Sequence, residues 1–513
     1  MPQSATIMVM SAETSPEFGK LRNFFWPIHR DELKLFLPLL IMYFLICLNY
    51  SILRTSRDAL VITAKSAGAE VLPFIKTWAI LPASLLIMLF FTQLSNRLSK
   101  EKVFYIMISL FLLFFSLFAF VLYPCHESLH PHAFADTCEK ILPRGLHGLI
   151  AVFRNWTFTV FYVMSELWGP AIMTVLFWGF ANEITSVNAG KRFYAILAVG
   201  GNLALVFSGA ISTTIANLGI KLNELNLEIT NDAWGNSLVL IASVLLGSGV
   251  LTMAIFRWLN VKVLKSYLSQ RGSFQLKRKN AEYKMGIRKI FAFLAQSKYL
   301  LCIATIVLTY NVAINFTEVV WKDQLHKLAP SPNFFHAYYG QVMTCIGLIA
   351  VVGAFFCGAI VRRFGWTFGA MVPPLILLAT SVPFFFFLFT DAPLASIVFL
   401  GAMQHCLAGA SKYTFYDATK EIAFIPLDQE SKLKGKAAID GVGSRIGKSG
   451  SALACQFLLM MFGSLSLTLP YIAILLFLVI IAWIYAVRSL GREFETLSAA
   501  RPTPTVNTTE TVS

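Results

Sequence analysis

Long apolar segments alternate with short polar segments along almost the whole chain. Many of the apolar segments reach the roughly 20 residues that an α-helix needs to cross the hydrocarbon core of a bilayer. Backbone polar groups in lipid must be satisfied within the protein, so we expect these segments to be helices of an all-α membrane protein. The twelve predicted spans are residues 35–60, 72–96, 103–123, 147–182, 191–218, 236–260, 298–320, 337–361, 367–390, 394–420, 437–462 and 468–488.

The fourth predicted span, 147–182, is too long for one straight crossing. Gly169 and Pro170 follow each other near its middle. Proline lacks a backbone donor and clashes with the preceding turn, so it kinks or breaks helices. We therefore expect this span to be tilted or broken near Trp168–Pro170.

Composition and charge agree with a membrane protein. The chain is 57% hydrophobic and 13% charged, whereas soluble proteins carry about 25% charged residues. A net charge of +15 in a soluble protein would suggest nucleic acid. Here most basic residues lie in short loops on one side of the predicted crossings, and the positive-inside rule places that side and both termini in the cytoplasm. The expected partner is a lipid bilayer, with no nucleic acid.

A basic connector divides the chain into two halves that resemble each other at three places in the same order. Such a parallel repeat of six spans is the plan of major-facilitator-like transporters, which hold their substrate between the halves. The matches are Phe177–Ile184 with Phe415–Ile422, Lys191–Gly200 with Lys434–Gly443, and Asn49 and Thr55 with Asn311 and Thr317. The predicted regions are a cytoplasmic tail at 1–34, an N-terminal half at 35–260, the connector at 261–297, a C-terminal half at 298–490 and a disordered tail at 491–513.

The glycine-rich stretch Gly435–Ser451 places several charges among apolar runs, namely Lys436, Asp440, Arg445 and Lys448. Charges at membrane depth are unfavourable, so they usually face a cavity and have a function. Glycines leave room beside these cations, and lysine and arginine are suited to phosphate. The stretch indicates a membrane protein that handles a polyanionic solute.

Further charges lie inside the spans expected to line the central cavity. An excess of buried cations needs an anion, because an unpaired buried charge is strongly unfavourable. The alternative is that these charges only neutralise one another, with Glu166 or Glu318 opposite Arg54 or Lys448. The charged residues are Arg54, Arg57 and Asp58 in span one, Glu166 in span four, Glu318 in span seven, Lys412 and Asp417 in span ten, and Arg445 and Lys448 in span eleven.

One loop combines Cys125 and Cys138 with His126, His130 and His132. These residues lack a familiar metal-ligand spacing, so we expect no metal site. If the loop is extracytoplasmic, a disulfide between the two cysteines is favoured.

Several long motifs resemble the nucleotide transporter family, the ATP/ADP translocases of plastids and obligate intracellular bacteria. The resemblance runs from about Leu35 to Arg492, and the length of the motifs makes it specific. The motifs are Tyr162–Gly169, Val175–Asn182, Ser411–Asp417, Lys420–Asp428 and Lys434–Asp440.

The resemblance implies exchange of external ATP for internal ADP and phosphate, although some family members take up nucleotides with protons. The functional charged positions of the family fall on Arg57, Glu166, Glu318 and Lys448, and a residue linked to phosphate exchange falls on Asn202. Arginine stands at position 57 where the family often has lysine, which keeps the charge and changes the geometry of a phosphate contact.

We therefore expect a monomeric ATP/ADP antiporter that works by alternating access in the cytoplasmic membrane of a bacterium. Its expected ligands are ATP, ADP and phosphate, and no cofactor, metal or enzymatic activity is expected. The rivals are a proton-coupled net importer of nucleotides, a membrane enzyme acting on a phosphorylated substrate, and a carrier of lipid or sugar phosphates. The expected substrate-binding residues are Arg54, Arg57, Glu166, Asn202, Glu318, Lys412, Arg445 and Lys448.

Overall fold

The structure is a computed structural model. It describes residues 26, 28–185, 187–227, 230, 232–264, 297–390, 392–436, 438–439 and 443–499. Most of the predicted N-terminal tail, connector and C-terminal tail, and Asp440 of the glycine-rich stretch, lie outside the described residues. The predictions for those regions stay predictions.

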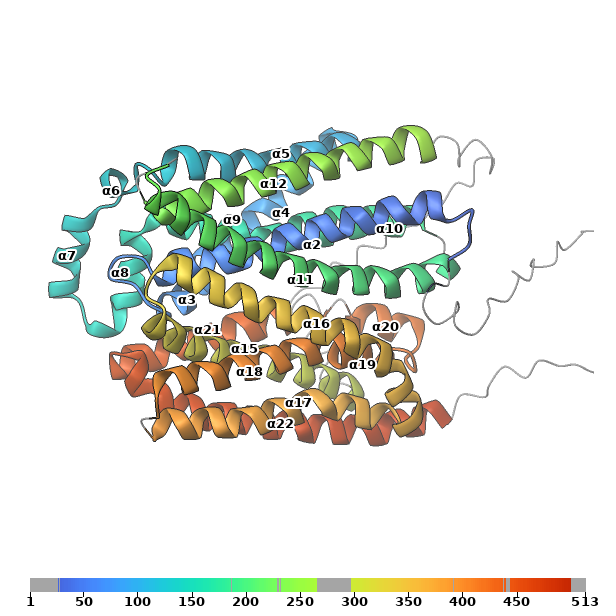
Figure 1. Cartoon of the computed structure of the whole chain (residues 1–513). Coiled ribbons are helices and arrows are strands. Elements are labelled where there is room, and N and C mark those ends of the chain that lie inside the picture. The colour runs from blue at the N-terminus through green and yellow to red at the C-terminus, as the bar shows by residue number, and fades with distance from the viewer. Residues whose placement is uncertain are drawn as a thin grey trace, which may run out of the picture.

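The described chain is helical throughout, which confirms the predicted all-α class (Figure 1). The first half comprises α2 Leu33–Ile62, α3 Val71–Phe74, η1 Ile75–Ile80, α4 Leu81–Arg97, α5 Lys100–Leu117, η2 Phe118–Leu122, α6 His126–Leu129, α7 His132–Ile141, η3 Arg144–Leu146, α8 His147–Arg154, α9 Trp156–Trp168, η4 Gly169–Phe177, α10 Trp178–Ile184, α11 Val187–Glu224, α12 Ala233–Trp258 and η5 Leu259–Leu264. The second half comprises α15 Lys298–Leu328, α16 Pro332–Phe364, α17 Trp366–Phe389, α18 Leu394–Ser411, η6 Lys412–Tyr416, α19 Asp417–Ala423, α20 Gln429–Lys436, α21 Ser444–Phe462 and α22 Leu465–Ala499.

Eleven helices among the described residues are long and apolar enough to cross a membrane. They correspond to the predicted spans one to ten and twelve. The predicted eleventh span is α21, a helix of 19 residues. Its first turns carry Arg445 and Lys448, so only its second part is continuously apolar.

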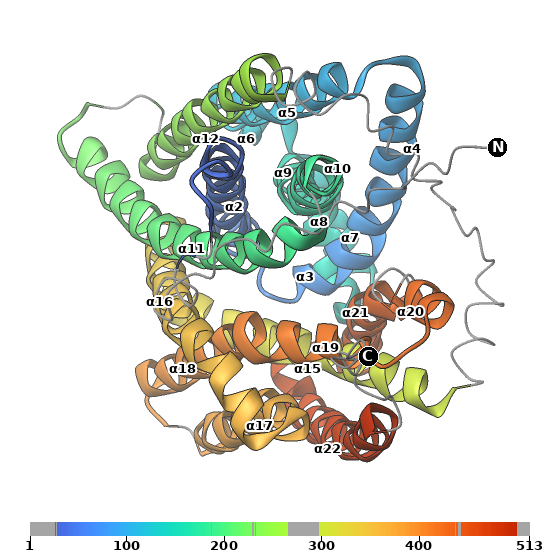
Figure 2. The same cartoon turned by 90° about the vertical axis from the view of Figure 1, so that its right-hand side faces the viewer.

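The helices form two bundles, seen from one end in Figure 2. The helices α2 to α12 make one half, and α15 to α22 make the other. Between the halves, α11 and α16 pack closely through glycines: a Cβ on Gly209 would lie 2.2 Å from the carbonyl oxygen of Gly340. Small residues permit this approach of two backbones within a membrane.

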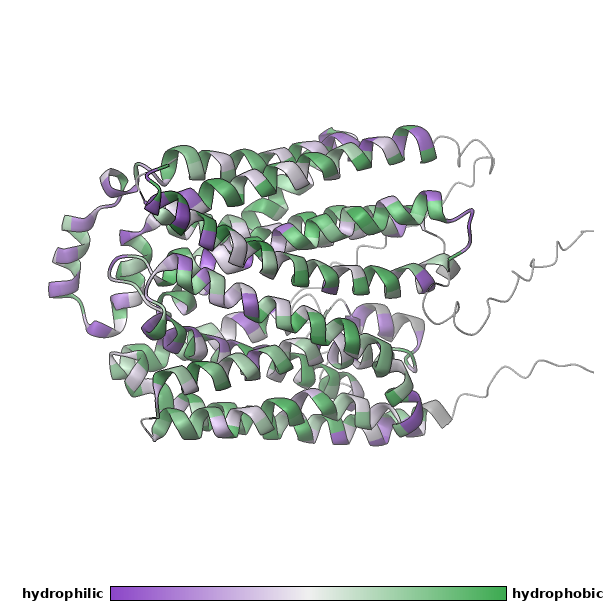
Figure 3. Ribbon diagram, viewed as in Figure 1, coloured by the Kyte–Doolittle hydropathy of each residue, from purple (hydrophilic) through white to green (hydrophobic). Residues whose placement is uncertain are grey.

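The bundle has two distinct ends. The terminal end is where α2 begins and α22 ends, on the right of Figure 1, and the far end is where α6 and α7 lie, on the left. Hydrophilic residues gather on α6 and α7 and near the helix ends, while the long helices are mostly hydrophobic (Figure 3). This distribution is the one expected for a chain that spans a bilayer along the helix axes.

The fourth span is irregular at two places. A change to π-helical geometry begins at Gly169, at the place where a tilt or break was predicted, but the helix continues from Trp156 to Ile184 and is not broken there. A break at Asn155 separates α8 from α9 and was not predicted. The tenth span changes in the same way at η6. The π segments overlap or adjoin the matched segments Phe177–Ile184 and Phe415–Ile422, so the internal repeat extends to this irregularity.

The predicted loop disulfide is wrong, because Cys125 and Cys138 are both free thiols. Cys125 caps the start of α6. Cys138 lies in α7 and lines an apolar groove of about 470 Å³ between α7, α8 and α9, together with Phe153 and Trp156. Cys138 therefore contributes to the apolar lining between α7 and α8 and does not form a cross-link.

Candidate functional site

The candidate site begins on one face of α2. Arg57 and Asp58 follow Arg54 by three and four residues, so both lie on the same side of the helix as Arg54. Arg57 and Asp58 are buried, with exposed fractions of 5% and 0%. Within a membrane such charges need partners from other helices.

Arg57 is held by other residues of its own half. Its guanidinium group forms an ion pair with Glu166 of α9. It lies 4.7 Å from the centroid of the Tyr162 ring and 3.8 Å from a carboxylate oxygen of Asp58. From the sequence, both residues were expected in the site, with Arg54 or Lys448 as the possible partner of Glu166, whereas in the structure Glu166 meets Arg57.

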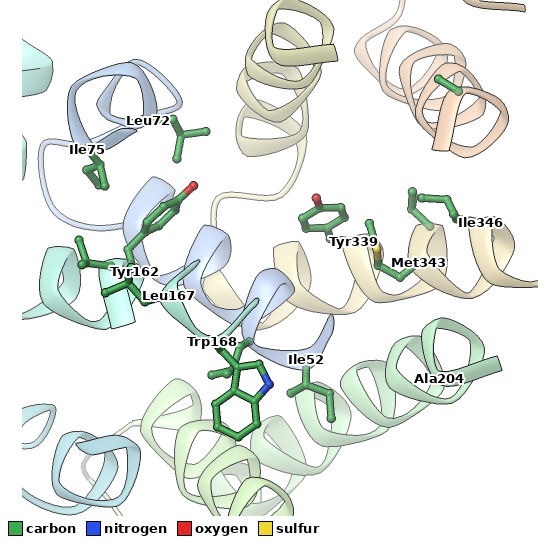
Figure 4. Close-up of a cluster of buried hydrophobic side chains, with 14 of the residues drawn as sticks. Ile52, Leu72, Ile75, Tyr162, Leu167, Trp168, Ala204, Tyr339, Met343 and Ile346 are labelled. Carbon is green, nitrogen blue, oxygen red and sulfur yellow. The ribbon is translucent and has the colours of Figure 1, made fainter. Parts of the chain in front are cut away.

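Glu318 of α15 is the point where the halves meet. Its Oε1 lies 3.2 Å from a guanidinium nitrogen of Arg54 and 2.7 Å from Nζ of Lys322. Its Oε2 lies 3.8 Å from Nζ of Lys76. The Tyr339 hydroxyl donates to Glu318 across 3.5 Å. Figure 4 shows the rings of Tyr339 and Tyr162, one from each half, among buried apolar side chains.

Two cations of this cluster were not among the predicted site residues. Lys322 donates to Glu318 and, across 2.7 Å, to Asp58 of the other half. Lys76 of η1 donates to the Asn315 side chain across 2.7 Å. Lys322 lay beyond the predicted end of span seven, and its spacing of four residues from Glu318 was the available signal. For Lys76 the signal was a single cation in an otherwise apolar span.

Arg445 and Lys448 lie in the first turns of α21. At the periodicity of an α-helix they share a face with Cys455 and Gln456, which are buried. Both cations are exposed and form no salt bridge among the described residues. They therefore lie on the inward face of α21, at the part of that face that the other half does not cover.

Lys412 and Asn202 take part in none of the central ion pairs. Lys412 is paired with Asp417 of its own half at 3.1 Å and lies 4.1 Å from the centroid of the Tyr413 ring. Asn202 is buried on α11, where its backbone carbonyl oxygen faces Gly347 of α16. The predicted site is thus one cluster around Arg54, Arg57, Glu166 and Glu318 with separate flanking residues.

The far end of the bundle is closed by contacts between the halves. The Gln456 amide nitrogen of α21 donates to the Pro73 carbonyl and to Thr77, each across 2.8 Å, and its oxygen accepts from Trp78. A Cβ on Gly145 would lie 2.4 Å from Cα of Met460, so the two backbones touch.

At the terminal end the same helices are uncovered. No residue of α4 is buried, and the first turn of α21 is exposed apart from Gly447 and the half-buried Ser444. The side chains of Arg54 and Lys76 are 20% and 19% exposed, and because the far end is closed, we infer that a solute reaches them from the terminal end.

The charges of the cluster are not balanced. Four cations, Arg54, Arg57, Lys76 and Lys322, meet three carboxylates, Asp58, Glu166 and Glu318. The exposed cations of α21 add to this surplus. Arginine can hold two oxygens of one phosphate, and lysine acts as a compact charge, so this arrangement suits a phosphate-bearing anion. Within the described residues, no group of three or more histidine, cysteine or acidic side chains could hold a metal ion.

The fold resembles solved transporters at low sequence identity. A crystal structure of a D-xylose-proton symporter aligns with a TM-score of 0.54 and 13% identity, covering 89% of this chain and 97% of that chain. A bacterial homologue of the iron transporter ferroportin, in an inward-facing state, aligns with a TM-score of 0.53 and 14% identity, covering 92% and 100%. These likenesses confirm the major-facilitator-like fold.

Relatives with much higher identity share almost the whole sequence. "ADP,ATP carrier protein 1" of Chlamydia trachomatis serovar D is 43% identical over 505 residues, covering 96% of this chain and 94% of the relative. "ADP,ATP carrier protein 1, chloroplastic" of Arabidopsis thaliana is 39% identical over 477 residues, covering 91% and 74%. The sequence model of the family described as TLC ATP/ADP transporter matches residues 11–494. The chain therefore belongs to the TLC ATP/ADP transporter family.

Proposed function

We propose that this protein exchanges ATP for ADP across a membrane by alternating access. The observation that carries the proposal is the surplus of cations where the two halves meet. Buried charges without partners are strongly unfavourable, so a site of this kind is completed by an anion. The names of the relatives, ADP,ATP carriers of chlamydiae and plastids, indicate which anion.

The exposed fractions suggest how the cations divide their work. Arg54 and Lys76 are partly exposed, and Arg445 and Lys448 are exposed. These four residues bind the phosphate groups in our proposal, while Glu166 and Glu318 balance the charge of the empty site and Arg57 is positioned between Glu166 and Asp58. Lys412 and Asn202 contribute from the flanks, Asn202 to the binding of free phosphate.

The direction and setting of transport belong to the same proposal. We place the terminal end in the cytoplasm of a bacterium, with the chain in the inner membrane, because the short loops predicted at that end are basic. External ATP then enters in exchange for internal ADP and phosphate. We propose that a monomer suffices, because one chain supplies both halves of the site.

Transport into liposomes tests the exchange. The purified protein is reconstituted with ADP or without nucleotide inside, and uptake of labelled ATP is followed in both preparations. We expect rapid uptake only with internal ADP. Comparable uptake into empty liposomes contradicts exchange. Loss of uptake after addition of a protonophore favours the proton-coupled importer instead, and competition by ADP but not by sugar phosphates separates the nucleotide carrier from a sugar-phosphate carrier.

A further inference from the structure

The most deeply buried ion pair of the site joins the two halves. Lys322 of α15 and Asp58 of α2 are separated by 2.7 Å, and their side chains are 1% and 0% exposed. A solute in the space beside Arg54 therefore cannot reach either of them. Their role differs from that of the partly exposed cations, although all of them belong to the same network.

The pair lies where the halves must separate. The far end is closed in this structure, so alternating access requires α2 and α15 to move apart there. Such a movement breaks the contact between Asp58 and Lys322. Separating a buried pair leaves uncompensated charge, which is strongly unfavourable. The pair therefore opposes opening of the far end while the site is empty.

Glu318 connects this pair to the exposed cations. It is shared by Lys322, Arg54 and Lys76, and the last two are the ones that a solute can reach. When a phosphate group binds Arg54 and Lys76, Glu318 no longer has to neutralise these two cations. Its negative charge is then available to Lys322 only. Asp58 still has Arg57 at 3.8 Å. Both members of the pair then keep a counter-charge after they separate.

We propose that Asp58 and Lys322 form a lock, which holds the far end closed until the phosphate groups of a nucleotide displace Glu318 from Arg54 and Lys76. The inference rests on the proposed function and adds a reason for strict exchange. A ligand shifts a conformational equilibrium only by binding one state better than the other. Here the difference arises because the bound phosphate frees Glu318 for Lys322. Asp58 and Lys322 are positioning residues and do not touch the nucleotide.

The double variant Asp58→Asn/Lys322→Gln tests the lock. Both charges are removed together, so neither is left buried alone, while Glu318 keeps Arg54 and Lys76 and Arg57 keeps Glu166. We expect ATP binding within about threefold of the wild type and uptake into ADP-free liposomes raised about tenfold or more, a typical size for coupling between two sites. The matched control is Lys100→Gln/Glu183→Gln, which removes an exposed pair within one half and keeps strict exchange.

Strict exchange by the double variant, with binding intact, overturns the lock. Failure of the wild type to exchange ATP for ADP overturns the proposed function instead, so the two failures are distinguishable. A second measurement needs no change in the pair. Cys455 is buried on α21 beside Gln456, and in a protein with Cys455 as its single cysteine, ADP supplied at the terminal end should speed its labelling by a membrane-impermeant maleimide added at the far end. Equal labelling with and without this ADP also overturns the lock.

Discussion

Glu318 carries one negative charge, yet it lies within salt-bridge distance of Arg54, Lys76 and Lys322. A carboxylate has two oxygens and can accept several hydrogen bonds, but it neutralises one positive charge only. The other two cations depend on Asp58 or on an anion from outside. Because Arg54 and Lys322 share the Glu318 carboxylate, an anion that binds Arg54 leaves more of the negative charge of Glu318 to neutralise Lys322. The site can therefore respond to a ligand.

At the residue scale, we predict that Lys448→Ala weakens uptake of ATP and of ADP together, by about tenfold, the size expected for loss of a hydrogen bond to a charged group. Lys448 lies on the inward face of α21 without a salt bridge in the described chain. Both nucleotides carry phosphates, so both should be affected. The measurement is the concentration dependence of exchange for each nucleotide in liposomes.

Lys100→Ala is the matched control for Lys448→Ala. Lys100 is 83% exposed and pairs with Glu183 within one half, so its loss should leave exchange at the wild-type level. If Lys448→Ala behaves like this control, Lys448 has no part in phosphate binding and the proposed site shrinks to the buried cluster.

The charged residues could be predicted individually, but the sequence could not select among their possible partners, of which Glu318 for Arg54 was one. Arg54, Arg57, Glu166 and Glu318 stand out because charges within apolar spans are unfavourable unless they have a function or a partner. The pairing of Arg54 with Glu318 joins residues 264 positions apart, and periodicity within one helix says nothing about such a contact. The sequence also left open whether the charges pair or bind ligand, and in the structure the buried ones pair while those of α21 do not.

At the scale of elements, most span boundaries followed from apolar length, whereas irregular segments followed from local chemistry. Gly169 and Pro170 indicated an irregularity where the π segment of the fourth span begins, because proline cannot donate a helix hydrogen bond. The matching π segment η6 contains no glycine or proline. Its only sequence signal was the similarity between spans four and ten, so tertiary packing and common descent of the repeats outweighed local propensity there.

The contact between α11 and α16 depends on glycine at a few positions. We predict that Gly209→Ala lowers the thermal unfolding midpoint, because the added Cβ would lie 2.2 Å from the Gly340 carbonyl oxygen and the backbones would have to separate. The measurement is the midpoint of thermal unfolding of the detergent-solubilised protein, followed by the fluorescence of a thiol-reactive dye or by light scattering.

Gly247→Ala provides the comparison for Gly209→Ala. Gly247 also lies within a helix, but a Cβ there meets no atom within 4 Å. Alanine is favoured over glycine in a helix by up to about 1 kcal/mol, so the midpoint should stay the same or rise. Equal effects of the two substitutions would mean that the α11–α16 contact does not contribute to stability.

At the scale of the whole molecule, the repeat predicted two halves with a site between them, but it could not predict which end is closed. An internal repeat describes each half alone, whereas closure depends on contacts between the halves, such as Gln456 with Thr77 and Gly145 with Met460. These contacts exist in one conformation of the cycle. Closure of the far end therefore belongs to one conformation only, and the same sequence must also adopt a conformation in which the far end is open.

This dependence on state gives the last prediction. In the closed far end a Cβ on Gly145 would lie 2.4 Å from Cα of Met460 and 2.6 Å from the Leu459 carbonyl oxygen. These are backbone atoms, which cannot turn aside as a flexible side chain can. Gly145→Trp should therefore hold the far end open, so that the protein still binds ATP but no longer transports it. Calorimetry of ATP binding and liposome exchange measure the two properties separately.

Gly68→Trp is the matched control, because Gly68 lies in the loop between α2 and α3 and a Cβ there meets a single atom, at 4.0 Å, of the flexible Glu70 side chain. This variant should transport at the wild-type rate.

Loss of both binding and transport in Gly145→Trp would indicate misfolding. The smaller Gly145→Ser, which meets the same backbone atoms, then tests whether the far end must close. Normal transport by Gly145→Ser with normal stability would contradict the tight far-end contact. The added side chain would lie 2.4 Å from Cα of Met460, so the two backbones could not approach as closely as they do in this structure. Binding without transport in either variant would show that closing the far end is a required step of the cycle.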